Sequence, residues 1–201
     1  MTKGKGSFKL VGAALILSLF SACASSPTMP PPRLTLQDVD PPEWVVKGGG
    51  AYDDSGGKAF YGVSSATGVK NYSLQRIASD DRARNDLAKV FEFYTKSLTK
   101  DYLAHTTAGD FEATSEEQNV EVAIKTVTVA TLMGVQIIDH WEHPYRNELF
   151  SLARLDLEKF KQNLDQYKEL SKEIRDAVKE RADKLHEELE REVLKKERIL
   201  S

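Results

Sequence analysis

Residues 58–66 read KAFYGVSSA, and a long stretch with helical spacing follows them in the chain. Phe60 and Tyr61 favour a β-strand, because aromatic side chains pack well on a pleated surface. Gly62 inside this strand is typical of a bulge or of a close approach by another backbone. From Ser73 onward, apolar residues recur near the period of a helix. That stripe consists of Leu74, Ile77, Ala78, Ala83, Leu87, Ala88, Phe91, Tyr94 and Leu98.

The next part of the chain begins with an ambiguous segment, NVEVAIKTVTVATLMG at residues 119–134. Its β-branched side chains favour a strand, whereas the spacing of its apolar residues is helical. Because Ser115 and Gln118 supply a capping box in front of it, we predict a helix. Two strands are expected next, over residues 135–143 (VQIIDHWEH) and 148–157 (ELFSLARLDL). Together with the first strand and the long helix, these elements predict an α+β fold with a small antiparallel sheet.

The chain ends in a strongly helical and highly charged segment, residues 158–201, with twelve basic and twelve acidic side chains. Pairs of opposite charge four residues apart, such as Glu180 with Lys184, support a long helix. A narrow apolar seam runs along it and is interrupted by Arg181. Such a seam has to be buried, either against its own domain or against a neighbouring copy of the chain. The seam residues are Leu164, Tyr167, Leu170, Ile174, Ala177, Val178, Leu185, Leu189 and Val193.

Residues 1–22 have the three-part composition of a secretion signal. Lys3, Lys5 and Lys9 precede an almost uninterrupted apolar run over residues 10–20, and two small residues follow the run. A membrane-spanning helix needs roughly 20 apolar residues, so this run is too short to span a bilayer. Its length suits the apolar core of a signal peptide that is removed from the mature protein.

The only cysteine of the chain, Cys23, ends the stretch LFSAC. A lone cysteine forms no internal disulfide, so three interpretations compete: a residue of the discarded signal, a free thiol, or the first residue of the mature chain. The stretch resembles the lipobox of bacterial lipoproteins, with Phe20 where leucine is commonest. The resemblance implies a thioether diacylglycerol on Cys23, cleavage after Ala22 and usually an N-acyl chain. Because each buried CH₂ contributes about 0.8 kcal/mol, two chains hold a protein stably on a membrane.

The residue after Cys23 is Ala24. An aspartate there would signal retention in the inner membrane of enteric-type bacteria, so by analogy the destination is the outer membrane. The segment that follows is rich in serine and proline, and its three consecutive prolines favour an extended spacer. The expected order is therefore a signal peptide (1–22), a lipidated N-terminus with a tether (23–40), an α+β domain (41–157) and an amphipathic charged helix (158–201).

Two segments contain residue types that are found in binding sites. Residues 47–57, KGGGAYDDSGG, lack the spacing, the Lys-Ser/Thr pair and the helix start of phosphate-binding loops, which favours a mobile loop or a hairpin. Residues 139–143, DHWEH, suggest a metal site, but neighbouring side chains of a strand point to opposite faces. At most two ligands would share a face, so we expect no metal. Trp141 is interpreted as a packing anchor, with the two histidines at the rim of the sheet.

Several stretches, in order over most of residues 41–195, resemble a family of bacterial outer-membrane lipoproteins named for a mass near twenty kilodaltons (the Lpp-twenty type). The stretches are PPEWV, FYGVSSA, DDRARNDLAKVF, IKTVTVATLMGVQIIDHWEHP, LFSLARLDLEKF and KELSKEIRDAVKERADKLHEELERE. The resemblance implies an order of strand, helix, strand, strand that is similar to the dodecin fold, and it favours a helix over residues 119–132. It also implies an envelope or surface lipoprotein, and some relatives are flagellum-associated proteins that build disks under the outer membrane. It carries over no catalytic signature, so Cys23 is the one functional residue.

The net charge and the lack of a catalytic pattern bear on the class of function. The net charge is −3, and the chain without its signal has 25 basic and 31 acidic side chains, which argues against nucleic-acid binding. No base and nucleophile stand at readable spacing, so we expect neither an enzyme nor a cofactor. The expected function is a structural, assembly or interaction role in the envelope, with copies of itself or other envelope proteins as partners. The alternative is a periplasm-facing module that binds an aromatic or lipid-like ligand near Trp44, Phe60, Phe91 or Trp141, side chains that equally suit an ordinary core.

Overall fold

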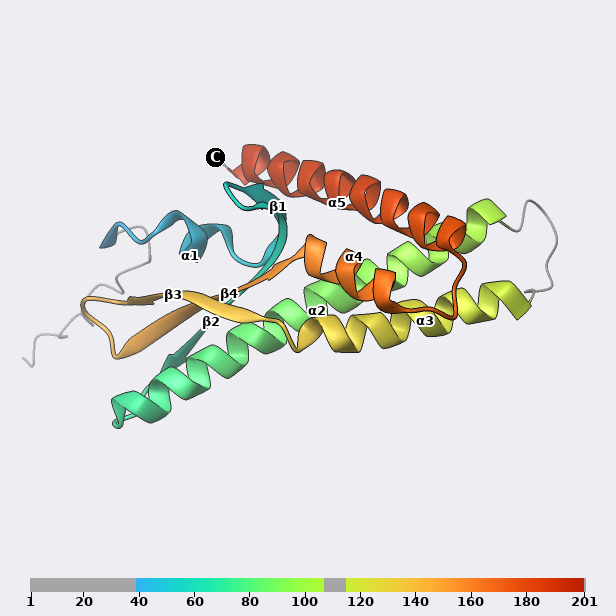
Figure 1. The fold of residues 1–201 in the computed structure, drawn as a ribbon. Coiled ribbons are helices and arrows are strands. Elements are labelled where there is room, and N and C mark those ends of the chain that lie inside the picture. Colours follow the sequence, from blue (N-terminus) through green and yellow to red (C-terminus); the bar gives the residue numbers. More distant parts are fainter. Residues whose placement is uncertain (1–38, 107–114, 201) are drawn as a thin grey trace, which may run out of the picture. The chain divides into compact units, whose positions relative to one another are not determined.

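The computed structural model describes residues 39–106 and 115–200, all of which belong to one compact unit, Leu34–Ser201 (Figure 1). The fold is α+β, as predicted: a four-stranded antiparallel sheet is packed by a long helix. The elements are α1 (Glu43–Lys47), β1 (Gly50–Asp54), β2 (Gly57–Thr67), α2 (Tyr72–Thr106), α3 (Ser115–Leu132), β3 (Gln136–Glu142), β4 (Glu148–Asp156), α4 (Leu157–Gln166) and α5 (Lys172–Leu200).

The sheet has the order β1-β2-β4-β3, with every neighbouring pair antiparallel. The Gly-rich segment proves to be the hairpin between β1 and β2, and its turn needs Gly57, whose φ of +99° is rarely adopted by L-residues. The ambiguous segment is helical, as predicted, and forms α3. At the edge of the sheet, β3 pairs with β4 and shifts register between Ile137 and Asp139.

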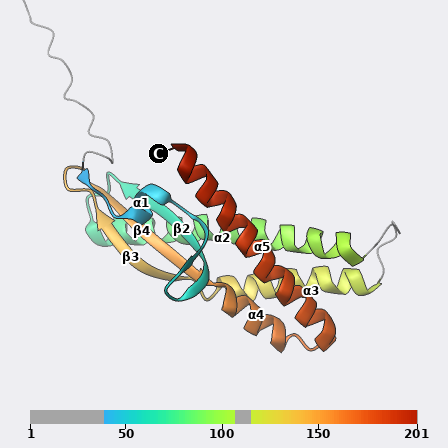
Figure 2. The same cartoon turned by 90° about the horizontal axis from the view of Figure 1, so that it is seen from above.

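Helix α2 lies along one face of the sheet in both views (Figures 1 and 2). It approaches most closely at Gly62 of β2, where an added Cβ would overlap the backbone nitrogen of Leu87 and the carbonyl oxygen of Ala83. Of the two interpretations that the sequence left open for Gly62, a bulge or a close approach by another backbone, the structure shows the close approach. Because the backbones meet directly here, the crossing of helix and sheet leaves no room for a side chain.

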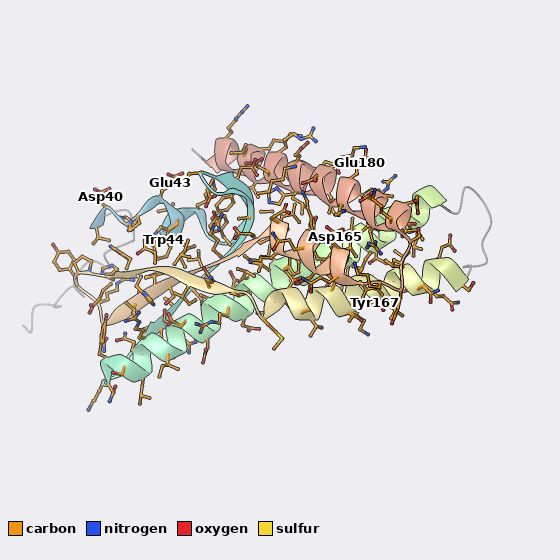
Figure 3. All side chains as sticks on the ribbon, viewed as in Figure 1. Asp40, Glu43, Trp44, Asp165, Tyr167 and Glu180 are labelled. Atoms are coloured by element: carbon orange, nitrogen blue, oxygen red, sulfur yellow. The ribbon has the colours of Figure 1, made fainter. Side chains whose placement is uncertain are left out.

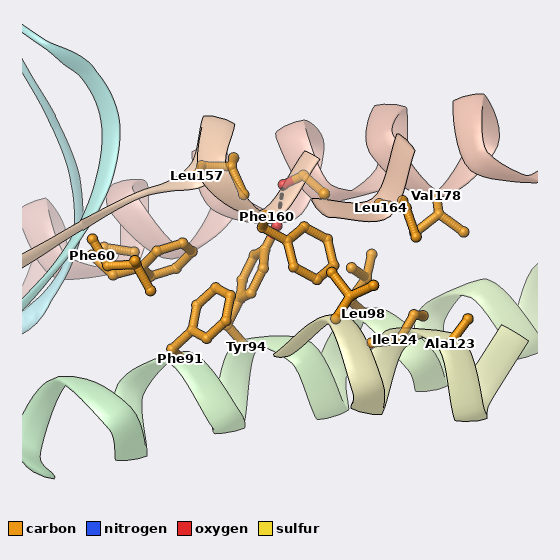
Figure 4. Packing of buried hydrophobic residues seen from close by; sticks show 14 of the residues in the cluster. Phe60, Phe91, Tyr94, Leu98, Ala123, Ile124, Leu157, Phe160, Leu164 and Val178 are labelled. Carbon is orange, nitrogen blue, oxygen red and sulfur yellow. Dashed lines mark hydrogen bonds between the residues drawn. The ribbon is translucent and has the colours of Figure 1, made fainter. Parts of the chain in front are cut away.

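The core is aromatic where β2, α2 and α4 meet (Figure 4). The ring centre of Phe60 lies 5.0 Å from that of Phe91 and 4.6 Å from that of Tyr94. Phe160 of α4 stands 5.8 Å from Phe91 and closes the cluster. All four side chains are buried, and the hydroxyl of Tyr94 donates a hydrogen bond of 2.8 Å to the carbonyl oxygen of Ala182.

The first two turns of α2 differ from the expectation. Leu74 and Ile77 were predicted to face the core, but they are 58% and 56% exposed. Gln75 and Ser79 face the sheet instead. The amide of Gln75 donates to the carbonyl oxygen of Ala66 (3.0 Å), so the exposed strand ends are satisfied by polar side chains of the helix. The face of α2 that carries Gln75 and Ser79 therefore packs on the sheet, where both side chains donate to backbone carbonyl oxygens.

The C-terminal segment, expected as one helix, forms two helices that are divided at residues 167–171. Arg175 holds this break by donating to the carbonyl oxygens of Tyr167 (3.2 Å) and Leu170. Most of the seam of α5 packs against its own domain: Val178 lies in the core, and Ile174, Leu185 and Leu189 are partly buried against it. The seam was not predicted exactly, because Ala177 is exposed and Ala182, outside the predicted seam, is buried. Of the two burial modes that the sequence left open, the structure contains the intramolecular one.

Ion pairs fasten α5 to the domain, and three of them join it to β2 and α4. Lys58 of β2 lies 3.2 Å from Asp183 and 2.9 Å from Glu187, and Lys161 of α4 lies 2.7 Å from Asp183. Partial burial of Asp183 raises its pKa, but the hydrogen bonds from Lys161 and Lys58 outweigh burial and lower the pKa. The ring of His186 is buried beside them, with Nε2 2.9 Å from the carbonyl oxygen of Ala59.

The opposite face of the sheet is covered by the segment that contains α1. Trp44 donates a hydrogen bond of 2.9 Å from its indole nitrogen to Asp139 of β3, and Val45 is buried. Below them, the rings of Tyr52 and Tyr61 stack with centres 4.2 Å apart. The first residues that the structure describes therefore close the second side of the sheet.

Candidate functional site

Cys23, the one functional residue predicted from the sequence, lies outside the described residues. Within residues 39–106 and 115–200, no helix is long and apolar enough to cross a membrane. Three arrangements of side chains in the described part were candidates for a site: a polar cluster under α2, a charged cluster on the other face of the sheet, and a groove between α2 and α3.

The polar cluster lies where α2 crosses β3 and β4. One carboxylate oxygen of Asp80 is 2.6 Å from Nε2 of His140 and accepts a hydrogen bond of 2.7 Å from the hydroxyl of Ser151. The hydroxyl of Ser79 is 2.7 Å from that of Ser151 and donates to the carbonyl oxygen of Leu149 (2.8 Å). Both serines are fully buried.

This geometry differs from that of a catalytic triad. A triad needs the histidine between the serine and the carboxylate, whereas here His140 and Ser151 both contact Asp80 and no bond joins them directly. The cluster instead satisfies polar groups that the close packing of α2 has removed from water. The sequence did not reveal this cluster, because Asp80 and Ser151 are 71 residues apart in the chain.

In the DHWEH segment, neighbouring side chains point to opposite faces of the sheet, as predicted. His140 faces α2, whereas Trp141 faces the other side and packs against Phe150 with ring centres 5.5 Å apart. His143 was expected at the rim but is buried, because the β3–β4 turn folds over it and the backbone N–H of Tyr145 donates to its Nδ1 (3.2 Å). In the described part of the chain, no three His, Cys, Asp or Glu side chains are grouped so that they could hold a metal ion.

The charged cluster ties β1, β2 and β4 together. Arg154 donates two hydrogen bonds of 3.0 Å to the carboxylate of Asp54, and the hydroxyl of Tyr61 donates to the same group. Partial burial raises the pKa of Asp54, but the bonds from Arg154, Tyr61 and the N–H of Gly56 prevail and lower it to about 2. Burial and the bond to Asp54 raise the pKa of Tyr61 to about 12. Asp54, Tyr61 and Arg154 are thus bonded to one another, and we interpret this cluster as structural.

The groove between α2 and α3 is the larger of the two main cavities of the described residues, with a volume of about 550 Å³. Ile124, Leu103 and Leu132 contribute apolar side chains to its lining. Thr99 and Thr128 also line it, but their hydroxyls donate to carbonyl oxygens of their own helices, at 3.0 and 2.6 Å. The groove thus offers few free polar groups along its walls.

The rim of this groove is charged. Three lysines, Lys96, Lys100 and Lys125, stand around it with Glu92 and Glu121. One weak pair, Lys96 with Glu92 at 4.0 Å, joins rim residues of opposite sign within the described part. An apolar trough with basic groups at its edge matches a ligand that has a long apolar body and an acidic end.

The aromatic residues considered as a ligand site do not surround this cavity. Phe60 and Phe91 are fully buried against each other, so they form ordinary core, as one of the two interpretations held. Trp44 and Trp141 pack on the face of the sheet opposite α2, and neither lines the groove. The groove was not visible in the sequence, because its lining alternates with the core stripe of two helices.

No family model matches the chain, and a search of curated proteins found no match. The resemblance to lipoproteins of the Lpp-twenty type therefore stays a prediction.

Proposed function

We propose that the chain is an outer-membrane lipoprotein with a structural, assembly or interaction role in the cell envelope. The observation that carries this proposal is the run of residues 10–23, where a short apolar core and two small residues precede the lone cysteine. The protein is anchored through acyl chains on Cys23 and works as an adaptor, with its α+β body facing the periplasm. Its partners are other envelope proteins or further copies of itself, in flagellar assembly or elsewhere in the envelope.

The described part supports this role in two ways. Its polar clusters are paired internally: one stabilises the contact between α2 and the sheet, and the other links β1, β2 and β4. In addition, α5 docks on its own domain, so the domain has a defined surface on which partners can assemble.

A Cys23→Ser variant tests the anchor. We expect the variant to accumulate as an uncleaved precursor, to take up no labelled palmitate and to lose the mass of the acyl chains. The wild-type chain should float with outer-membrane vesicles on a sucrose gradient. Ser21→Thr, a small change beside the cleavage site, serves as the control that should still be processed. Normal cleavage and normal membrane recovery of Cys23→Ser would refute the anchor.

The groove favours one further candidate function, the binding of a fatty acid with its chain between α2 and α3 and its carboxylate near the lysines of the rim. The chain without its first 23 residues, incubated with oleate, should retain one equivalent in native mass spectrometry. Thr99→Trp fills the groove and should abolish retention, whereas Val122→Trp, at an exposed position of α3 outside the lining, should not. Equal retention by the two variants would rule the groove out.

A further inference from the structure

Four large apolar side chains are exposed at one end of the sheet. Tyr72, Leu74 and Ile77 lie on the first two turns of α2, and Tyr145, which is 72% exposed, lies in the β3–β4 turn. Exposed apolar residues of a soluble protein are usually scattered singly over its surface. We call these four residues the end patch.

Hydrogen bonds hold the two halves of the end patch together. Asn147 of the β3–β4 turn accepts a bond of 3.2 Å at its carbonyl oxygen from the backbone N–H of Gly68 and another of 3.2 Å from the side chain of Gln75. The side chain of Asn147 donates in turn to the carbonyl oxygen of Val69 (3.0 Å). Figures 1 and 2 show the turn and the start of α2 at the same end of the sheet. These bonds therefore hold the two segments that carry the end patch at fixed positions relative to each other.

Basic side chains accompany the end patch. Lys70 and Arg76 are exposed, and neither has an acidic partner within 4.0 Å among the described residues. Arg146 is also exposed and stands 3.8 Å from Glu148. Tyrosines with lysine and arginine are the residues that favour the boundary between lipid headgroups and acyl chains, because their apolar parts are buried while their polar ends reach water or phosphate.

The tether enters the domain at this end. The described chain begins at Val39, the sixteenth residue after Cys23, and an extended chain covers at most about 3.3–3.6 Å per residue. Val39, the first described residue, therefore lies within about 58 Å of Cys23. Both cartoon views place the first described residues beside the β3–β4 turn, and Figure 3 labels Asp40 at that end.

We propose that the end patch rests on the bilayer that holds the acyl chains of Cys23. The four apolar side chains enter the boundary below the headgroups, and Lys70 and Arg76 contact lipid phosphates. Because Cys23 is the proposed anchor, this placement depends on the proposed function. A patch of this size binds weakly alone, but the short tether keeps it at high local concentration near the surface. The far end of α2 and α3 then points away from the membrane, where the groove is open to partners.

The test uses the mature lipidated protein, reconstituted into vesicles of phosphatidylcholine and phosphatidylglycerol with or without brominated acyl chains. An environment-sensitive bimane label is attached to Ile77→Cys in one sample and to Phe93→Cys in another. Both positions are exposed on α2, at 56% and 64%, and they are sixteen residues apart, which is about 24 Å along a helix. The thioether at Cys23 does not react with the label, and thermal unfolding checks that each labelled variant is folded.

We expect brominated lipids to quench the label at residue 77 at least about twofold and the label at residue 93 by less than a tenth of that. Equal quenching at the two positions, or none at either, would overturn the placement. Shielding of residue 77 from both brominated lipid and aqueous iodide would also overturn it and would indicate a protein contact. Flotation of the same samples separates the two proposals. If the protein floats with the vesicles but the label at residue 77 is not quenched, only the placement of the end patch on the bilayer is refuted. If the protein does not float with the vesicles, both the anchor and the placement are refuted.

Discussion

The two halves of α2 pack in opposite ways. From Tyr72 to Asp86 the helix meets the sheet through small and polar side chains, with Gly62 opposite Ala83 and the carboxylate of Asp80 inside the contact. From Leu87 onward it meets β2, α4 and α5 through large apolar side chains (Figure 4). The first half is therefore sensitive to added volume and to lost hydrogen bonds, whereas the second half depends on apolar volume and has few polar contacts.

The difference follows from the geometry of the partner. A sheet exposes backbone carbonyls at its ends, and Gln75 and Ser79 are needed there as donors. Helices satisfy most of their own backbone groups, so α4 and α5 contact α2 mainly through apolar side chains, with the bond from Tyr94 to Ala182 as one buried polar contact. One continuous helix thus has two kinds of interface, and its hydrophobic pattern describes only the second.

The largest expected effect is that of Gly62→Ala. Its Cβ would overlap two backbone atoms of α2, which cannot move without shifting the helix, so we expect destabilisation of at least about 3 kcal/mol, at or above the upper end of ordinary overpacking. Gly50→Ala is the matched control, since its nearest neighbours would be 3.5 Å away or more, and it should cost less than about 1 kcal/mol. Urea unfolding measures both. Similar costs for the two variants would contradict the close approach.

Asp80→Ala probes the polar half of the contact. It leaves Ser151 and His140 without their acceptor inside a tight interface, and we expect a loss of about 1–3 kcal/mol. Asp81→Ala, at the next position, removes only an exposed pair with Arg84 and should change stability by less than about 0.5 kcal/mol. An effect of Asp80→Ala no larger than that of Asp81→Ala would show that the cluster contributes nothing.

Tyr94→Phe probes the apolar half. The variant keeps the ring in the core and removes one hydrogen bond to Ala182, whose carbonyl is part of helix α5, so we expect a loss of only about 0.5–1.5 kcal/mol. Tyr145→Phe, at an exposed position, should be neutral in the same thermal unfolding assay. A loss above 3 kcal/mol would mean that polar contacts matter as much in this half as in the first.

The smallest expected effect is the loss of folding stability at low pH when Asp54 becomes protonated. Because the pKa of Asp54 is lowered from 3.8 to about 2 in the folded state, its contribution is complete above about pH 4 and is lost as the pH falls towards 2. Its side chain is about one-third exposed, so solvent screening reduces the contribution to under about 1 kcal/mol. Arg154→Met should flatten this part of the pH profile, as measured by denaturant midpoints between pH 2 and pH 5. An unchanged profile would mean that Arg154 does not hold the pKa of Asp54.

The sequence predicted the elements well where one signal decided them. The capping box and helical spacing identified α3, and the glycines of residues 47–57 identified a possible hairpin. The prediction from helical spacing was wrong for Leu74 and Ile77, which are exposed. Spacing alone does not show that a polar side chain such as Gln75 is needed to donate to a backbone carbonyl of the sheet. The sequence also could not find Ser151 as a partner of Asp80, since the two are 71 residues apart.

The sequence by itself determined the α+β class, the long helix and the prediction of an anchor at Cys23, because spacing and local composition carry that information along the chain. Only the tertiary structure decided that the seam of α5 is buried against its own domain, that Asp80 is the centre of a buried cluster, and that Leu74 and Ile77 stay exposed beside the β3–β4 turn. The physical reason is that burial and hydrogen-bond satisfaction are properties of pairs of elements, and the partners of a pair are chosen when the chain packs.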